Sequence, residues 1–258
     1  MIKNQSIGVA SSANGFQGLD GILGVGPVDL TLHTVSNTAT VPTVMDNLYS
    51  QGTISEEVLG IYFVPSVNND SIGELTFGGY DPSVVITPLE YVSLTTTPDA
   101  SLYWGVNQSV SYGDEIIQSN AAGIIDTGTT LIYLGMGERC VETNGPQADL
   151  QLADAFQKYQ KATGGVPDES TSLLTINAAQ YARLKPLSFN IGGVHLDLTP
   201  NAQIWPRSLN SIIGGNASAI YLAVGDLGTT PDVKFQFVNG YTFLCVNLSL
   251  FFLIQSNY

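Results

Sequence analysis

Short strand-forming runs, each closed by a turn residue, are the feature that most constrains the fold of this chain. Val, Ile, Thr, Tyr and Phe recur in brief stretches that end at Gly, Pro, Asn or Asp. Such residues favour pleated strands, and the 27 glycines allow tight turns between them. A length of 258 residues with 44% hydrophobic content is sufficient to bury a core. The predicted fold class is therefore all-β.

Local signals place individual elements within this pattern. Alternating small and apolar residues over 6–28 predict a buried strand with tight turns, which ends in Ile22-Leu23-Gly24. A similar apolar strand is expected to end at Val238-Asn239-Gly240. Other strands are predicted at 58–63 and 72–79, and further strands up to about Leu134. A helix is predicted at 44–50, capped by Thr43 and followed by Gly52. A second helix is predicted from Leu152 to Gly164. A third is predicted after Asn177, which forms a capping box with Gln180.

The charge balance excludes two classes of partner. Eight Lys and Arg face 22 Asp and Glu, so the net charge is -14. This charge would repel phosphate backbones and anionic membranes, so neither nucleic acid nor membrane is an expected partner. The acidity fits a protein that works at low pH, and it fits simple solubility equally well. The apolar stretch at 244–254 is too short to span a bilayer.

Sequence signals for secretion point in two directions. Five N-x-S/T sequons, at Asn4, Asn69, Asn107, Asn216 and Asn247, fit a secreted glycoprotein. The first six residues contain no apolar region, so no signal peptide is predicted in this chain. Cys140 and Cys245 are too few for a disulfide framework and leave the redox compartment open. No zinc-ligand spacing occurs, and no metal or organic cofactor is expected.

The segment 122–133 carries the chemistry. Asp126 lies between two apolar stretches, where a carboxylate is costly to bury without a hydrogen-bond network. Gly128 permits a tight loop, and the hydroxyls of Thr127 and Thr129 can orient the carboxylate. His33 and His195 have no partners that indicate catalysis, and no G-x-S-x-G motif supports a serine hydrolase.

Asp126-Thr127-Gly128-Thr129-Thr130 resembles the second active-site loop of pepsin-like aspartic proteases, with the closest match among fungal enzymes of the polyporopepsin type. Residues 20–24, 75–79 and 241–244 also resemble segments of that family. The resemblance implies a bilobal pepsin-like fold and an aspartic endopeptidase that acts on polypeptides and is secreted. It implies that Asp126 is catalytic, that Thr127, Gly128 and Thr129 support the loop, and that Thr130 contacts substrate.

The family chemistry requires a second catalytic aspartate, and this chain does not supply one. No other Asp-Thr-Gly or Asp-Ser-Gly occurs, and a partner as far before Gly24 as Asp126 is before Gly240 would precede Met1. We therefore expect residues 1–68 to be a remnant of the first lobe and residues 69–258 to be a second lobe that lacks its last strands. The flap should also precede Met1, and the chain alone should be inactive. The missing strands should leave unpaired edges and exposed apolar surface.

Two stretches do not resemble the family. They cover about 135–152 and 245–258, and they contain both cysteines. Our hypothesis is that both are translated introns or misjoined exons and that Met1 is an internal or artificial start.

Two alternatives to the endopeptidase remain open. One is a non-catalytic β-protein that binds peptides and is derived from an aspartic protease. The other is a homodimer in which two Asp126 loops form the catalytic pair, although the first-lobe remnant would obstruct that interface. The oligomeric state is not predicted.

Overall fold

A computed structural model describes residues 1–12, 18–65, 73–85, 89–135, 154–228, 235–246 and 254–255. The chain forms two compact units. Unit 1 comprises residues 1–61, 75–82 and 252–258, and unit 2 comprises residues 62–74 and 83–251. The lobe boundary predicted at residues 68–69 lies outside the described residues and stays a prediction.

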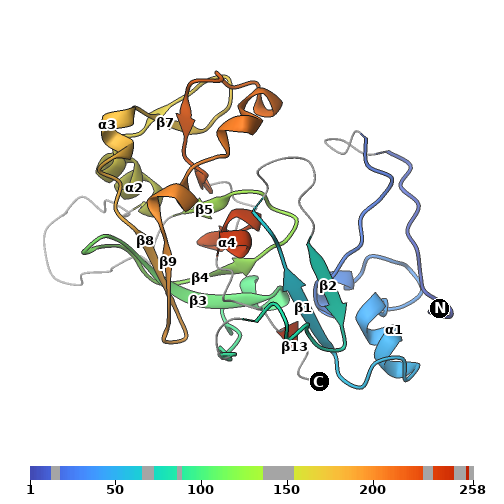
Figure 1. Ribbon diagram of the computed structural model, residues 1–258. Helices are drawn as coiled ribbons and strands as arrows, with labels where there is room; N and C mark the ends of the chain where they lie inside the picture. Colours follow the sequence, from blue (N-terminus) through green and yellow to red (C-terminus); the bar gives the residue numbers. More distant parts are fainter. Residues whose placement is uncertain are drawn as a thin grey trace, which may run out of the picture. The chain divides into compact units, whose positions relative to one another are not determined.

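Unit 2 is built on a seven-stranded sheet in the order β11-β5-β12-β4-β3-β8-β9, in which β3 and β4 are the long central strands (Figure 1). Side chains alternate along β3 as a half-buried strand requires, because Val106, Gln108, Val110 and Tyr112 all face the core. A smaller sheet has the order β10-β7-β6. The bounds are β3 (Gly105–Tyr112), β4 (Glu115–Ile125), β5 (Ile132–Leu134), β6 (Val166–Pro167), β7 (Leu174–Ile176), β8 (Leu187–Ile191), β9 (Val194–Leu198), β10 (Ile220–Tyr221), β11 (Val224–Asp226) and β12 (Phe237–Asn239).

Both helices predicted in unit 2 are present, and the start predicted for the first one at Leu152 lies outside the described residues. Helix α2 (Ala155–Thr163) begins after Asp154, whose carboxylate accepts the backbone N–H of Phe156 at 2.9 Å. It ends at Gly164, which adopts a left-handed conformation with φ of 70°. Helix α3 (Ala178–Tyr181) starts with the predicted capping box. Two of the three helix predictions are thereby confirmed. The remaining helical segments are α4 (Tyr241–Val246), η2 (Ala100–Leu102), η3 (Pro200–Gln203) and η4 (Arg207–Ile213).

Asp154 gives unit 2 a predicted pH response. Burial raises the pKa of Asp154 above its ordinary value, and the nearby carboxylate of Asp226 adds to the effect. A carboxyl group with a raised pKa binds its proton more tightly in the folded protein than in the unfolded protein. Its contribution to stability is therefore fully present below the pKa of the unfolded state, and it is lost as pH rises through the pKa of the folded state. We expect Asp226→Asn to lower the Asp154 midpoint in a carboxyl NMR titration. Asp197→Asn is the control, and an equal shift in both variants would contradict this assignment.

The described residues of unit 1 form one α-helix, one short 3₁₀ helix and one small sheet. Helix α1 (Val44–Ser50) begins at Thr43, which forms a capping box with Asp46, and Gly52 follows with φ of 68°. This confirms the third helix prediction. The sheet has the order β13-β1-β2, formed by β1 (Val58–Tyr62), β2 (Glu74–Phe77) and β13 (Ile254–Gln255). The short 3₁₀ helix η1 covers Val28–Thr31.

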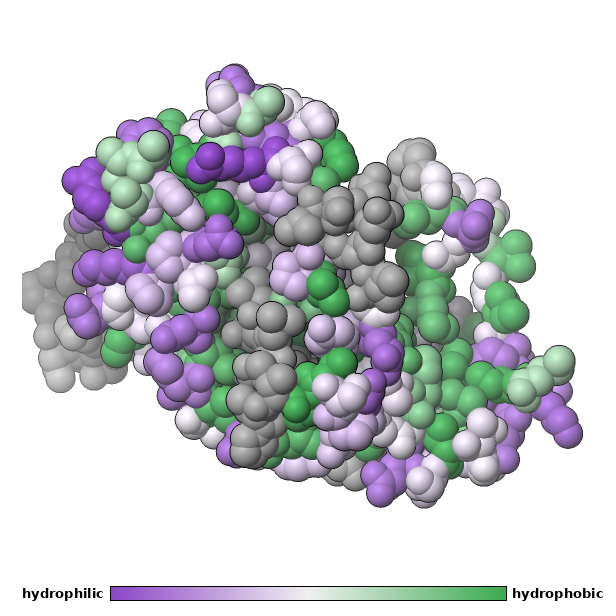
Figure 2. Space-filling model, viewed as in Figure 1, coloured by the Kyte–Doolittle hydropathy of each residue, from purple (hydrophilic) through white to green (hydrophobic). Residues whose placement is uncertain are grey.

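The strand predicted over residues 6–28 is wrong. Residues 6–12 and 18–27 form no strand, and the side chains of Ile22 and Leu23 are 73% and 55% exposed. No described strand pairs with this segment, so no described sheet covers Ile22 and Leu23. Figure 2 shows hydrophobic side chains at the surface of this unit. The exposed apolar surface expected from the sequence is therefore present here, and it also includes Ile7, Val9 and Leu19.

Candidate active site

Asp126 occupies the turn that links two strands separated by a third. Strand β12 lies between β4 and β5, parallel to β4 and antiparallel to β5. The chain leaves β4 at Ile125 and enters β5 at Ile132, so the intervening turn starts and ends beside the end of β12. Pairing with β12 therefore holds both ends of the turn.

Hydrogen bonds hold the Asp126 carboxylate in one orientation. The backbone N–H of Gly128 donates to Oδ1 at 2.9 Å, and the Thr129 hydroxyl donates to Oδ2 at 2.6 Å. The N–H of Asp126 donates to the backbone oxygen of Asn239 at 3.1 Å. Asp126 is half-buried, so its carboxylate is fixed by the loop and still accessible. A carboxylate held in this way can act as a general acid or base on a bound water or carbonyl.

The start of α4 fastens the other side of the loop. The N–H groups of Gly240 and Tyr241 donate to the carbonyls of Leu131 and Thr129 at 3.1 and 2.7 Å. The backbone N–H and hydroxyl of Thr242 both donate to the carbonyl of Thr130, at 3.0 and 2.8 Å. The loop is therefore held by backbone hydrogen bonds at its start, at Asp126, and over 129–131.

The structure brings the predicted site residues together in this one loop. Gly128 and Thr129 contact the Asp126 carboxylate directly. Thr130 is exposed and lines a pocket of about 740 Å³. Thr127 is half-buried and forms no hydrogen bond with a described residue. The catalytic role of Asp126 and the substrate role of Thr130 remain predictions.

A chain of buried amides lies behind the loop, and the sequence analysis missed it. Asn239 Nδ2 donates to Gln108 Oε1 at 2.8 Å, and Gln108 Nε2 donates to Gln118 Oε1 at 3.4 Å. Gln118 Nε2 donates to the Gln236 carbonyl at 3.0 Å. All three side-chain amides are at most 2% exposed. The sequence contained a signal for these buried amides. Gln108 lies between Val106 and Val110 at a core-facing position in the alternation of β3, where a polar side chain is unusual.

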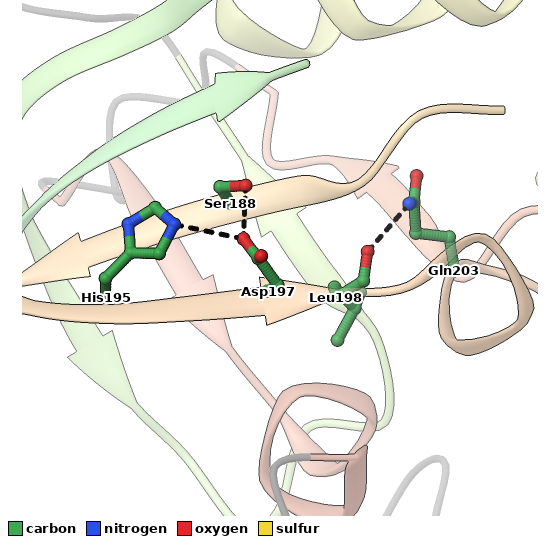
Figure 3. A network of polar contacts seen from close by, with 5 residues as sticks. All are labelled: Ser188, His195, Asp197, Leu198 and Gln203. Atoms are coloured by element: carbon green, nitrogen blue, oxygen red, sulfur yellow. Dashed lines mark hydrogen bonds and ion pairs between the residues drawn. The ribbon is translucent and has the colours of Figure 1, made fainter. Parts of the chain in front are cut away.

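Ser188, His195 and Asp197 form a polar cluster that is not a catalytic triad (Figure 3). The Ser188 hydroxyl donates to Asp197 Oδ1, and His195 Nε2 lies 3.1 Å from the same oxygen. The acid therefore sits between the serine and the imidazole, whereas a triad requires the imidazole in the middle. His195 and His33 are both exposed, in agreement with a solvent-facing role.

Other chemistry finds little support in the described residues. Burial raises the pKa of the Cys245 thiol to about 11, so it stays protonated and a poor nucleophile at neutral pH. Among the described residues, no cluster of three or more His, Cys, Asp and Glu side chains could hold a metal ion. No helix in the described part of the chain is long and apolar enough to cross a membrane.

Comparisons with known proteins point to one family. The family described as "Eukaryotic aspartyl protease" matches residues 1–214. The chain is 50% identical to polyporopepsin of Irpex lacteus over 247 residues, which are 94% of this chain and 68% of that protein. It is 31% identical to rhizopuspepsin-1 of Rhizopus niveus over 239 residues, 90% of this chain and 52% of that protein.

A solved structure extends the similarity to the fold. The crystal structure of aspartic proteinase from Irpex lacteus matches with a TM-score of 0.83 and 50% identity, covering 93% of this chain and 67% of that one. The predicted pepsin-like fold is confirmed, and the chain corresponds to about two thirds of that relative.

Proposed function

Because the chain belongs to the eukaryotic aspartyl protease family, we propose that Asp126 is one of the two catalytic carboxylates of an aspartic endopeptidase. The observation that carries the proposal is the loop in which Gly128 and Thr129 each donate to one oxygen of Asp126. Family members hydrolyse peptide bonds, so the substrate is a polypeptide. No cofactor is required for this chemistry.

The reaction needs two carboxylates that share one proton. One carboxylate removes a proton from a water molecule, which attacks the scissile carbonyl carbon, and the other acid protonates or polarises the carbonyl oxygen. Two carboxyl groups at short distance cannot both ionise easily, because their negative charges would repel each other. The shared proton is therefore kept between them. The donors to Asp126 orient its two oxygens, so its lone pairs point in fixed directions.

This chain alone is proposed to be inactive. Its sequence contains a single Asp-Thr-Gly, and 32% of polyporopepsin lies outside the aligned part. A lone carboxylate can bind water but cannot both activate it and protonate the carbonyl. The second carboxylate must therefore come from a segment equivalent to the part of the relatives that the chain does not cover.

A chimera tests this function. Polyporopepsin would supply the part outside the alignment, and this chain would supply the matched part, including the Asp126 loop. We expect the chimera to cleave a denatured protein at acid pH and to be inhibited by a statine-type transition-state mimic. Asp126→Asn in the chimera should reduce the cleavage rate by at least about a hundredfold.

The isolated chain completes the experiment. We expect no cleavage by the 258-residue chain or by its Asp126→Asn variant. Cleavage by the chain that is lost in Asp126→Asn would show that Asp126 finds a partner carboxylate, for example in a dimer. A folded chimera that is inactive would contradict the proposed role of Asp126.

The pocket beside Thr130 favours a second candidate function, peptide binding without cleavage. In that case the chimera would bind peptides without hydrolysing them, and Asp126→Ala would leave their affinity unchanged.

Secretion is proposed from the family resemblance. Asn4, Asn107 and Asn216, three of the five sequon asparagines, are exposed and therefore accessible to glycosylation. Expression with a fungal secretion leader, followed by glycosidase treatment, should produce a mobility shift on a gel. No shift would remove this support.

A further inference from the structure

The pocket beside the Asp126 loop lies within unit 2 and has a volume of about 740 Å³. Thr130 brings the loop to its wall, and Tyr241 and Thr242 line it from the start of α4. Trp205 lines it from just before η4, and Arg207 lines it from the first position of η4. The pocket therefore adjoins the loop that would carry the catalytic carboxylate.

The charge of the pocket is opposite to that of the chain. Among the described residues that line it, Arg207 is the only charged side chain, and none is Asp or Glu. The whole chain has 22 acidic and only 8 basic residues. The Arg207 guanidinium lies 5.9 Å from the centre of the Tyr181 ring and forms no ion pair with a described carboxylate. It is thus available to an anionic ligand, and a guanidinium suits two-point binding of a carboxylate.

A second donor in the pocket wall also lacks a partner. Trp205 Nε1 is buried and forms no hydrogen bond with any described residue. This N–H has almost no accessible surface, so the Arg207 guanidinium is the charged donor that is open to a ligand in the pocket. The indole and the Tyr241 ring offer apolar contact for a short aliphatic stem. The pocket therefore combines one unpaired guanidinium with an apolar wall.

We propose that this pocket binds an acidic side chain of the polypeptide substrate, with its carboxylate paired to Arg207. The proposal rests on the proposed endopeptidase function for the identity of the ligand as a peptide. Glutamate fits best, because its longer stem can lie against Trp205 while the carboxylate reaches the guanidinium. Arg207 thereby makes the substrate preference of this chain more acidic than an all-apolar pocket would.

Binding measurements on the 258-residue chain test the proposal without cleavage. The probes are peptides with acetylated N-termini and amidated C-termini that contain one glutamate among apolar residues, paired with the same peptides carrying glutamine. Calorimetry at pH 6 keeps the glutamate ionised. We expect the glutamate peptide to bind at least about tenfold more tightly than the glutamine peptide, as one well-formed charged contact provides.

Variants assign the preference to one residue. Arg207→Gln should abolish the difference between the two peptides, and Arg207→Lys should retain part of it. Arg183→Gln is the matched control, because Arg183 is an exposed arginine in the same unit that does not line the pocket, and it should retain the full preference. Circular dichroism would confirm that each variant is folded.

NMR locates the bound peptide. Of the two indole N–H resonances, that of Trp205 should move on addition of the glutamate peptide, and that of Trp104 should not. Equal affinity for the two peptides, no binding of either, or a preference that survives Arg207→Gln would each overturn the proposal. An inactive chimera would refute the endopeptidase function and leave this binding result unaffected, so the two failures can be told apart.

Discussion

Gly240→Ala is expected to destabilise unit 2 by about 3 kcal/mol, the upper end of the cost of forcing extra atoms into a packed site. A Cβ atom at Gly240 would lie closer than 3.0 Å to the carbonyl oxygens of Thr129 and Leu131. Both oxygens belong to backbone that cannot rotate away, and both accept hydrogen bonds from Gly240 or Tyr241. Relief of the clash would therefore displace the Asp126 loop.

Urea unfolding followed by circular dichroism measures this loss. Gly24→Ala is the matched control, because Gly24 ends the similar segment Ile22-Leu23-Gly24 and has no atom within 4 Å of the position of a Cβ. We expect Gly24→Ala to change the free energy of unfolding of the protein by no more than about 0.5 kcal/mol. Similar effects of the two substitutions would contradict the packing described for Gly240.

Gln108→Leu is expected to destabilise unit 2 by about 1–3 kcal/mol, because it leaves buried polar groups without partners. The substitution removes the acceptor of Asn239 Nδ2 and the donor to Gln118 Oε1. Leucine has a similar volume, so the cost arises from the unpaired amides rather than from a cavity.

A double-mutant cycle separates this interaction from other effects. Asn239→Leu alone leaves Gln108 Oε1 unpaired, whereas the double variant removes both partners of the 2.8 Å bond. The double variant should therefore be destabilised by less than the sum of the single variants, with a coupling energy of about 0.5–3 kcal/mol. Gln157→Leu, at an exposed site on α2, should change stability by less than about 0.5 kcal/mol. Simple additivity of the Gln108 and Asn239 effects would show that the two amides do not interact.

Local signals in the sequence were sufficient where the structure depends on neighbouring residues. The helices after Thr43, Asp154 and Asn177 start at side chains that bond to the backbone within three residues. The hydrogen bonds from Gly128 and Thr129 to Asp126 are equally local. These features could be predicted because the required partners are adjacent in the sequence.

Features that depend on distant partners could not be read in this way. Ile22-Leu23-Gly24 and Val238-Asn239-Gly240 have similar sequences, yet the first is exposed without a strand and the second is in β12 between two strands. The difference lies in the presence of partner strands, which the segment itself does not encode. The amide contact of Gln108 with Asn239 and the pocket at Trp205 and Arg207 likewise join segments far apart in the chain.

The position of β12 between β4 and β5 also sets an order of events during synthesis. Strand β5 ends at Leu134 and β12 begins only at Phe237, so β12 leaves the ribosome long after the two strands it must separate. Until it arrives, the Asp126 N–H and the loop carbonyls lack their partners, and closing so long a segment is slow. The loop is therefore fastened by distant partners only after residues 239–242 have been made, and a nascent chain that stops earlier holds the Asp126 carboxylate through its local bonds alone.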